Sequence, residues 1–319
     1  MRAGSSPAFQ AAAREQGRRL GLGIATYIEG APGPLGFMDA VMPGLSAFAG
    51  SEPIHAVLEG DGSVTLHTRQ VPHGQGHETT LAQVAADELG VPVEAVRVRY
   101  GDTKFAPFGI SGTGGSLSAA MAGGAVALAA HTLREHIVDI AADLLEASPA
   151  DIVIEGGDIH VAGVPAMSRT FREVAQEAMR RGVVDGAAGN DRQGRGEAIR
   201  IHRDWNGGQG GWAQATHVCW VEVDLETGQV KILRYAVVED CGEMINPAIV
   251  EGQIRGGVAQ GVGAVFYEKT TYGQDGQPRS GTFMDYLIPT AMEIPAIEIH
   301  HVETPTDIRS TIEASARGE

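Results

Sequence analysis

Four glycine-rich clusters lie where an apolar stretch typical of a strand gives way to a helical pattern. The clusters are His73–Thr80, Ser111–Ser118, Cys241–Pro247 and Gly252–Gly261. Exposed backbone N–H groups and the positive end of a helix dipole meet at such places, so the chemistry that they suit is anion binding. Taken singly, a cluster of this kind is more often a structural turn than a ligand site.

Two other site chemistries fit the clusters poorly. The second cluster partly matches the dinucleotide fingerprint GxGxxG, but Leu117 stands where the third glycine belongs, and no clean βαβ unit surrounds it. His73 and His77, followed by Glu78, resemble the zinc ligands of a protease helix, but HExxH places the glutamate directly after the first histidine. The intervening glycines also disfavour a helix. We therefore expect neither a nicotinamide site nor a metal ligand here, and loop-bonding or solvated histidines are the alternative.

Gln253 and Gln260 are seven residues apart, which places their amides on one face of a helix. They could present these amides to a ligand. Helix capping or hydrogen bonding in the core explains such residues equally well.

The composition excludes several classes of partner. Forty acidic against twenty-four basic side chains give a net charge of −16, which repels a phosphate backbone, so nucleic acid is not an expected partner. We find no apolar run long enough for a membrane span and no secretory signal, and we expect a cytoplasmic protein. Cys219 and Cys241 are the only cysteines, so this chain holds no iron–sulfur cluster of its own.

The hydrophobic pattern predicts how the clusters are positioned. Hairpins are expected around residues 59–62, 156–157 and 226–228, another turns at Asp275-Gly276, and Leu20–Ile28 reads as a buried strand. Helices are expected near residues 11–19, 80–89, 116–147 and 171–181, and from Asn246-Pro247 onward. Strands and helices do not alternate regularly, which indicates an α+β fold with mixed, mainly antiparallel sheets and packed helices. The polar, glycine-rich stretch 182–211 suggests a boundary between two lobes, residues 1–200 and 201–319.

Several blocks, in order and spacing, resemble one protein family. They are HGQGHETTLAQVAADELGV, GDT, PFGISGTGGSLSAAMAGG, VEVDLETGQVKILRYAVVEDCGEMINPAIVEGQIRGGVAQGVG, GTFMDYLIP and HVETP. Together they are similar to the molybdopterin-binding large subunit of the xanthine dehydrogenase, aldehyde oxidase and carbon monoxide dehydrogenase family. The similarity covers nearly the whole chain from about Leu20 and corresponds to the C-terminal portion of such a subunit.

The resemblance implies a molybdenum–molybdopterin cofactor, in bacteria usually the cytosine dinucleotide form, and a set of residues that hold it. Bacterial relatives often carry arginine where this chain has Leu117, so one phosphate contact differs. The residues that the resemblance places along the pterin and its diphosphate are Gln75, Gly76, His77, Thr113, Gly114, Gly115, Ser116, Ser118, Cys241, Asn246, Gln253 and Gln260.

The ends of the sequence depart from the family pattern. Relatives carry a GxKGxGE block whose glutamate is the active-site base, and here only Gly318-Glu319 matches it, which implies Glu319 as the base. An earlier GGGFG block does not occur, so the N-terminal half of the large subunit is missing from this sequence and is an expected partner.

The resemblance implies oxidative hydroxylation of an aldehyde, an N-heterocycle or a related small carbon substrate with water. Electrons would pass to FAD on a medium subunit and [2Fe-2S] clusters on a small subunit, within a dimer of heterotrimers. The alternative is a non-catalytic molybdopterin-binding module or a truncated, inactive gene product.

Overall fold

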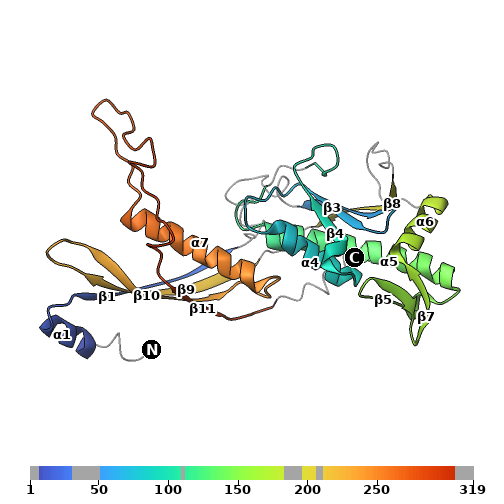
Figure 1. The fold of residues 1–319 in the computed structure, drawn as a ribbon, viewed down its shortest axis with the longest axis horizontal. Coiled ribbons are helices and arrows are strands. Elements are labelled where there is room, and N and C mark those ends of the chain that lie inside the picture. The colour runs from blue at the N-terminus through green and yellow to red at the C-terminus, as the bar shows by residue number, and fades with distance from the viewer. Residues whose placement is uncertain (1–6, 31–50, 109–111, 183–195, 206–210, 306–319) are drawn as a thin grey trace. The chain divides into compact units, whose positions relative to one another are not determined.

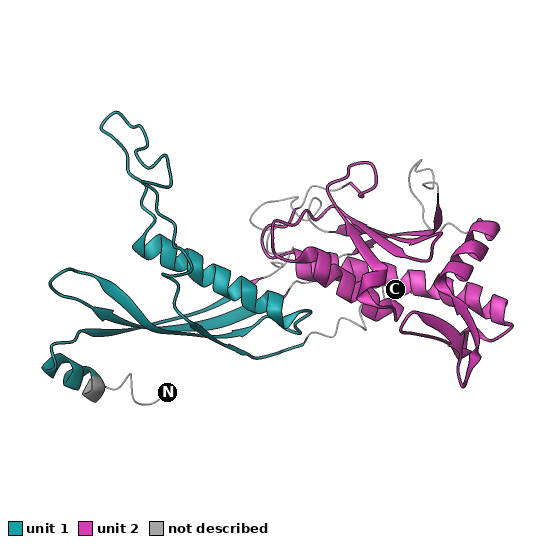
Figure 2. Ribbon diagram, in the orientation of Figure 1, with its two compact units in different colours: residues 1–29, 213–305 teal, residues 30–212, 306–319 magenta. Residues whose placement is uncertain are grey.

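The computed structural model describes residues 7–30, 51–108, 112–182, 196–205 and 211–305 (Figure 1). The chain divides into two compact units (Figure 2). Unit 1 comprises residues 1–29 and 213–305, and unit 2 comprises residues 30–212 and 306–319. Both units combine helices with mainly antiparallel sheets, which confirms the expected α+β class.

Unit 2 contains a four-stranded sheet in the order β4-β3-β2-β8 and a three-stranded sheet in the order β5-β6-β7. Its elements are β2 (Glu52–Glu59), β3 (Val64–Thr68), α4 (His77–Leu89), β4 (Val96–Arg99), α5 (Gly123–Leu145), β5 (Ile152–Glu155), β6 (Asp158–Val161), β7 (Val164–Thr170), α6 (Phe171–Arg181) and β8 (Glu197–Trp205). Short 3-10 turns at Val93–Ala95 and Pro149–Asp151 and a wide helical turn at Ser118–Ala122 complete the unit.

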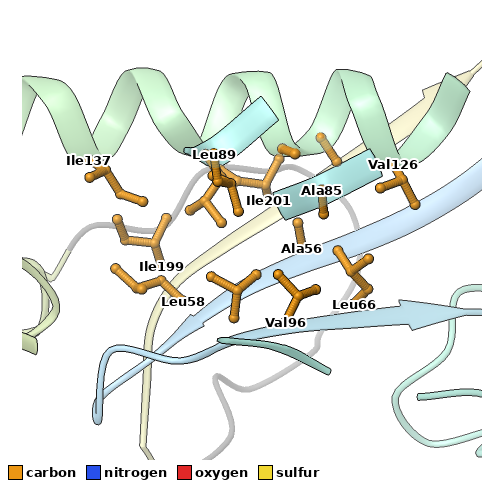
Figure 3. Close-up of a cluster of buried hydrophobic side chains, with 14 of the residues drawn as sticks. Ala56, Leu58, Leu66, Ala85, Leu89, Val96, Val126, Ile137, Ile199 and Ile201 are labelled. Atoms are coloured by element: carbon orange, nitrogen blue, oxygen red, sulfur yellow. The ribbon is translucent and has the colours of Figure 1, made fainter. Parts of the chain in front are cut away.

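One face of the four-stranded sheet packs against α4 and α5 and forms the main core (Figure 3). Alternate residues of each strand point toward the helices, as in a sheet that is covered on that face. β2 contributes Ala56 and Leu58, and β8 contributes Ile199 and Ile201, all fully buried. The helices whose first turns follow the glycine clusters are therefore fixed to one rigid sheet.

Gly124 lets α5 approach β8 closely. A Cβ atom built on Gly124 would lie 2.4 Å from Cε2 and Nε1 of the buried Trp205 ring, whereas one on Gly123 meets nothing within 4 Å. The Gly123-Gly124 pair thus permits the close packing that glycine in a helix suggests.

Gly124→Ala should destabilise the fold relative to Gly123→Ala. Both changes raise helix propensity equally, because each replaces glycine with alanine in α5. The difference between their free energies of unfolding, about 1–3 kcal/mol, therefore measures the clash with Trp205 alone. Denaturant unfolding of both variants measures it, and equal stabilities would show that the ring moves aside without penalty.

Unit 1 is a four-stranded sheet in the order β1-β9-β10-β11 with one long helix on it. Its elements are α1 (Pro7–Glu15), β1 (Leu20–Gly30), β9 (Trp212–Val223), β10 (Val230–Asp240), α7 (Pro247–Phe266) and β11 (Ile297–His301). Val258 and Val262 of α7 pack against Val237 and Ile297 of the sheet and form a small core.

Several predicted elements are confirmed. β2 pairs with β3 and β9 with β10 as antiparallel hairpins, α6 has the expected bounds, and Asn246 caps α7 with Pro247 in its first turn. At Asp275-Gly276 the described residues hold a single bridge, Tyr272 to Pro278, rather than two strands.

Other expectations need correction. Residues 182–211 are not simply a polar connection, because they contain β8, whose apolar residues enter the core of unit 2. The expected lobe boundary at residue 200 falls inside this strand, and residues 1–29 group with unit 1 because β1 pairs with β9. β1 is also not a buried strand: it lies at a sheet edge, with Ile24 and Ile28 about two-thirds exposed.

Among the described residues, no helix has both the length and the hydropathy that crossing a bilayer requires.

Candidate functional site

The first glycine cluster forms a bend between β3 and α4. Gly74 and Gly76 both have positive φ, +106° and +80°, which favours glycine at these positions. Gly76 is the N-cap of α4, and no side chain caps that end of the helix. The first turn of α4 therefore presents backbone N–H groups at the positive end of the helix dipole, where an anion is favoured.

His77 is the first residue of α4 and is buried, and its Nδ1 atom has no hydrogen-bond partner. Burial lowers the pKa of His77, so the neutral imidazole is favoured. The Gln75 side chain is used inside the bend, because its Oε1 accepts from the backbone N–H of His73 at 2.6 Å. An unpartnered buried nitrogen beside an uncapped helix end fits a ligand with polar groups.

The second cluster forms an exposed bend ahead of α5. Gly115 and Ser116 are both left-handed, with φ of +64° and +57°. A non-glycine residue in this region is strained by about 1–3 kcal/mol, and such strain persists where the surroundings enforce it. Cβ atoms built on Gly114 and Gly115 would meet nothing within 4 Å, so the space beside the bend is open to a bulky group.

A direct contact joins the two bends. Thr113 Oγ1 lies 3.3 Å from His73 Nδ1, forty residues earlier in the chain. The structure thus brings together Gln75, Gly76, His77, Thr113, Gly114, Gly115 and Ser116 in unit 2. Ser118 differs from them because it is buried and donates to Gln70 Oε1 at 3.0 Å.

Two histidines that the sequence did not single out, the half-buried His55 of β2 and the buried His67 of β3, are cross-strand partners. Phe105, in the loop after β4, has its ring centre 5.7 Å from that of His67, and its carbonyl oxygen is 3.1 Å from His55 Nδ1. Burial, and then the nearby Arg200 guanidinium, lowers the pKa of both His55 and His67 to about 4. Single histidines in apolar strands carry no distinctive sequence signal.

These histidines predict acid sensitivity. Both pKa values are depressed below the value of about 6.5 in the unfolded chain, so protonation favours unfolding, and stability is lost as pH falls from about 6.5 toward 4. The His67→Gln variant should therefore lose less stability on acidification than the wild type, by on the order of 1–3 kcal/mol. Unfolding at about pH 7 and pH 4.5 measures it, and parallel losses in variant and wild type would contradict the assignment.

In unit 1, Asp240 joins the third cluster to the HVETP block. Its carboxylate accepts from the backbone N–H groups of Gly242 at 3.0 Å and Thr304 at 3.1 Å, and from the Thr304 hydroxyl at 2.5 Å. The bonds from Thr304 and Gly242 hold the pKa of Asp240 below its usual value. Burial, followed by the nearby Glu239 carboxylate, raises the pKa of the Cys241 thiol to about 12, so this thiol stays protonated.

The remaining predicted residues of unit 1 lie on α7. Asn246 Oδ1 accepts from the backbone N–H of Ile249 at 3.2 Å, which is the helix-capping role. Gln253 and Gln260 are both exposed on the helix. Cβ atoms on the neighbouring Gly256 and Gly257 would meet nothing within 4 Å, so this side of α7 is also open. Glu319 lies outside the described residues.

The comparison with protein families decides what these blocks represent. Residues 4–295 match the model of the molybdopterin cofactor-binding domain. The chain belongs to this family. The resemblance seen in the sequence blocks is thereby confirmed.

Relatives of this molybdopterin-binding chain are subunits of larger enzymes. It is 40% identical to the nicotine 6-hydroxylase large subunit of Paenarthrobacter nicotinovorans over 94% of its own length and 36% of that protein. It is 34% identical to the carbon monoxide dehydrogenase large chain of Hydrogenophaga pseudoflava, over 90% of this chain and 34% of that one. The chain thus spans about a third of the length of these curated relatives.

Solved structures show the same fold. Quinoline 2-oxidoreductase of Pseudomonas putida 86 superposes with a TM-score of 0.78 at 38% identity, covering 94% of this chain and 37% of that one. The Cu,Mo-CO dehydrogenase superposes with a TM-score of 0.76 at 30% identity, covering 94% and 37%.

Proposed function

We propose that this chain is the cofactor-holding part of a molybdenum hydroxylase large subunit. The enzyme would hydroxylate an aldehyde, an N-heterocycle or a related small carbon substrate, with water as the source of oxygen. The observation that carries the proposal is the Thr113–His73 contact, which places two open bends side by side in a family that binds molybdopterin. The molybdenum cofactor supplies the redox capacity, and the chain supplies binding and orientation.

The bends of unit 2 fit the anionic part of such a cofactor. The uncapped start of α4 and the successive left-handed residues Gly115 and Ser116 offer backbone N–H groups, and His77 Nδ1 offers a buried polar atom without a partner. We infer that Gln75, Gly76, His77, Thr113 and Gly114 lie along the same ligand. This arrangement suits an anionic group such as the diphosphate of the cytosine dinucleotide form of the cofactor.

We infer that Cys241, Asn246, Gln253 and Gln260 of unit 1 also contribute to cofactor binding. The protonated thiol of Cys241 is a weak donor, and the exposed amides of Gln253 and Gln260 offer both donors and acceptors. The glycines beside these amides leave room for a bulky group. For Asn246, capping of α7 is the role supported by its contact with Ile249.

Replacing Gly115 with leucine should reduce retention of molybdenum and pterin by at least about tenfold, because the side chain would occupy the open side of the bend. Gly163→Leu is the matched control: Gly163 lies between β6 and β7, has a similar φ of +76° and has nothing within 4 Å. Metal analysis and fluorescence of the extracted pterin measure retention. Equal retention in both variants would contradict the proposed bend.

We propose Glu319 as the base that accepts the proton lost by the attacking water. In the assembled enzyme, Glu319→Gln should leave cofactor content unchanged and reduce turnover about 10²- to 10⁴-fold. Glu313→Gln, in the same terminal stretch, is the control. Turnover that is unchanged in the Glu319 variant would place the base elsewhere.

The partners follow from the same proposal. Electrons would leave through [2Fe-2S] and FAD groups on a small and a medium subunit in the cytoplasm, within a dimer of heterotrimers. Strongly exposed apolar residues of unit 1, among them Phe283, Met284 and Met292, support a further polypeptide that covers this unit.

Complementation distinguishes an enzyme part from a non-catalytic module. The chain is purified alone and together with a polypeptide that supplies the remaining length of its relatives. The proposal predicts gains in molybdenum content and in dye-reducing activity with the second polypeptide. Cofactor binding without any gain in activity would favour a non-catalytic module.

A further inference from the structure

A network of buried, hydrogen-bonded polar side chains connects the sheet of unit 2 to the turn that precedes α5. It consists of Glu52 at the start of β2, Arg69 and Gln70 directly after β3, and Ser118 just after the second glycine bend. Glu52 and Gln70 are 1% and 0% exposed, and Ser118 is 7% exposed. These side chains lie at the edge of an otherwise apolar core.

Each hydrogen bond of this network has a defined donor and acceptor. Glu52 Oε2 accepts from Arg69 Nη2 at 2.9 Å, from Arg69 Nε at 3.0 Å and from Gln70 Nε2 at 2.8 Å. Because an amide nitrogen can only donate, this contact sets the orientation of the Gln70 amide, and its Oε1 faces Ser118. The Ser118 hydroxyl then donates its single proton to Gln70 Oε1 at 3.0 Å.

A serine whose proton points into the core cannot donate it to an anion at the same time. The family resemblance implies that Ser118 holds the cofactor through its hydroxyl, but its burial and its bond to Gln70 favour a different role. Ser118 follows the strained Ser116 by two residues. It is therefore well placed to hold the end of the bend rather than to touch the ligand.

The bend has few other supports. Nothing lies within 4 Å of a Cβ built on Gly112, Gly114 or Gly115, so packing around these residues does not fix their conformation. One end of the bend is held by the Thr113–His73 contact. The other end is held by Leu117, which packs against the core, and by the bond from Ser118 to Gln70.

We propose that Glu52, Gln70 and Ser118 are positioning residues that hold the Gly115–Ser116 bend in its left-handed conformation for the cofactor. This inference rests on the proposed function of the bend. Glu52 orients Gln70, Gln70 binds Ser118, and Ser118 fixes the bend, whose exposed N–H groups face the ligand. One oxygen of Glu52 is buried without a partner, a destabilising arrangement that a purely stabilising network would avoid.

A double-mutant cycle on the 319-residue chain tests the proposal, with Ser118→Ala, Gln70→Leu and the double variant expressed in a bacterium that makes the cofactor. The first readout is hydrogen exchange of the amides of residues 112–118 in the cofactor-free chain. The second is the half-time of pterin release from the loaded chain. Each single variant should speed both processes about fivefold or more, because the bend loses its anchor.

The double variant should be no faster than the faster single variant, because Ser118 acts only through Gln70. Thr132→Val is the control: Thr132 is also buried in α5, and its hydroxyl donates to Leu128 O. It should lower global stability and leave both readouts of the bend unchanged.

Two results would overturn the proposal. Unchanged exchange in Ser118→Ala would show that the bond does not hold the bend. The second result concerns pterin release. If Ser118→Ala speeds release by the same factor in the Gln70→Leu variant as in the wild type, Ser118 binds the cofactor directly. If the wild-type chain binds no pterin even together with the polypeptide that supplies the remaining length of its relatives, the proposed function fails, while the exchange experiment still decides the role of Ser118. If Gln70→Leu does not fold, exchange in Ser118→Ala alone decides it.

Discussion

Two successive left-handed residues, Gly115 and Ser116, are the constraint on which the candidate site depends. Glycine adopts this conformation freely, whereas serine adopts it only where its surroundings enforce it. Turns in which successive backbone N–H groups point to one side form concave, anion-binding surfaces. The strain of Ser116 is therefore consistent with a backbone shaped for a ligand rather than for stability.

The fold meets this constraint by fixing both sides of the bend to one rigid frame. α4 begins directly after the first bend, α5 follows the second bend through the turn at Ser118–Ala122, and both helices pack on the same face of the four-stranded sheet. Gly124 lets α5 lie close to Trp205 of β8, and the Thr113–His73 contact joins the two bends. Protein cores are close-packed and resist deformation, so a helix that packs on such a core holds its first turn and its N–H groups in place.

The sequence predicted those parts of the molecule in which local signals and tertiary packing agree. The β2–β3 and β9–β10 hairpins, α6 and the capped start of α7 all combine turn chemistry with hydrophobic periodicity. β8 escaped prediction because it is surrounded by polar, glycine-rich sequence, and its burial depends on the distant α5. The edge position of β1 is likewise set by pairing with β9, about 190 residues away in the chain.

For the candidate site, too, local features could be predicted and features set by distant contacts could not. Glycine clusters before helices indicated where backbone N–H groups would be exposed, and the bends in unit 2 have that geometry. Which side chains turn inward could not be foreseen from spacing. Ser118 stands in the same block as Thr113, yet it donates to Gln70 in the core, and the polar partners Glu52 and Gln70 lie at strand ends that carry no motif.

The two bends of unit 2 are proposed to bind one anionic cofactor, and an experimental structure of the cofactor-loaded protein would test this. We expect the pterin or its diphosphate to accept hydrogen bonds from the backbone of the Gly114–Ser116 bend and, at the same time, to contact the first turn of α4 or His77 Nδ1. A cofactor bound away from both bends would contradict it.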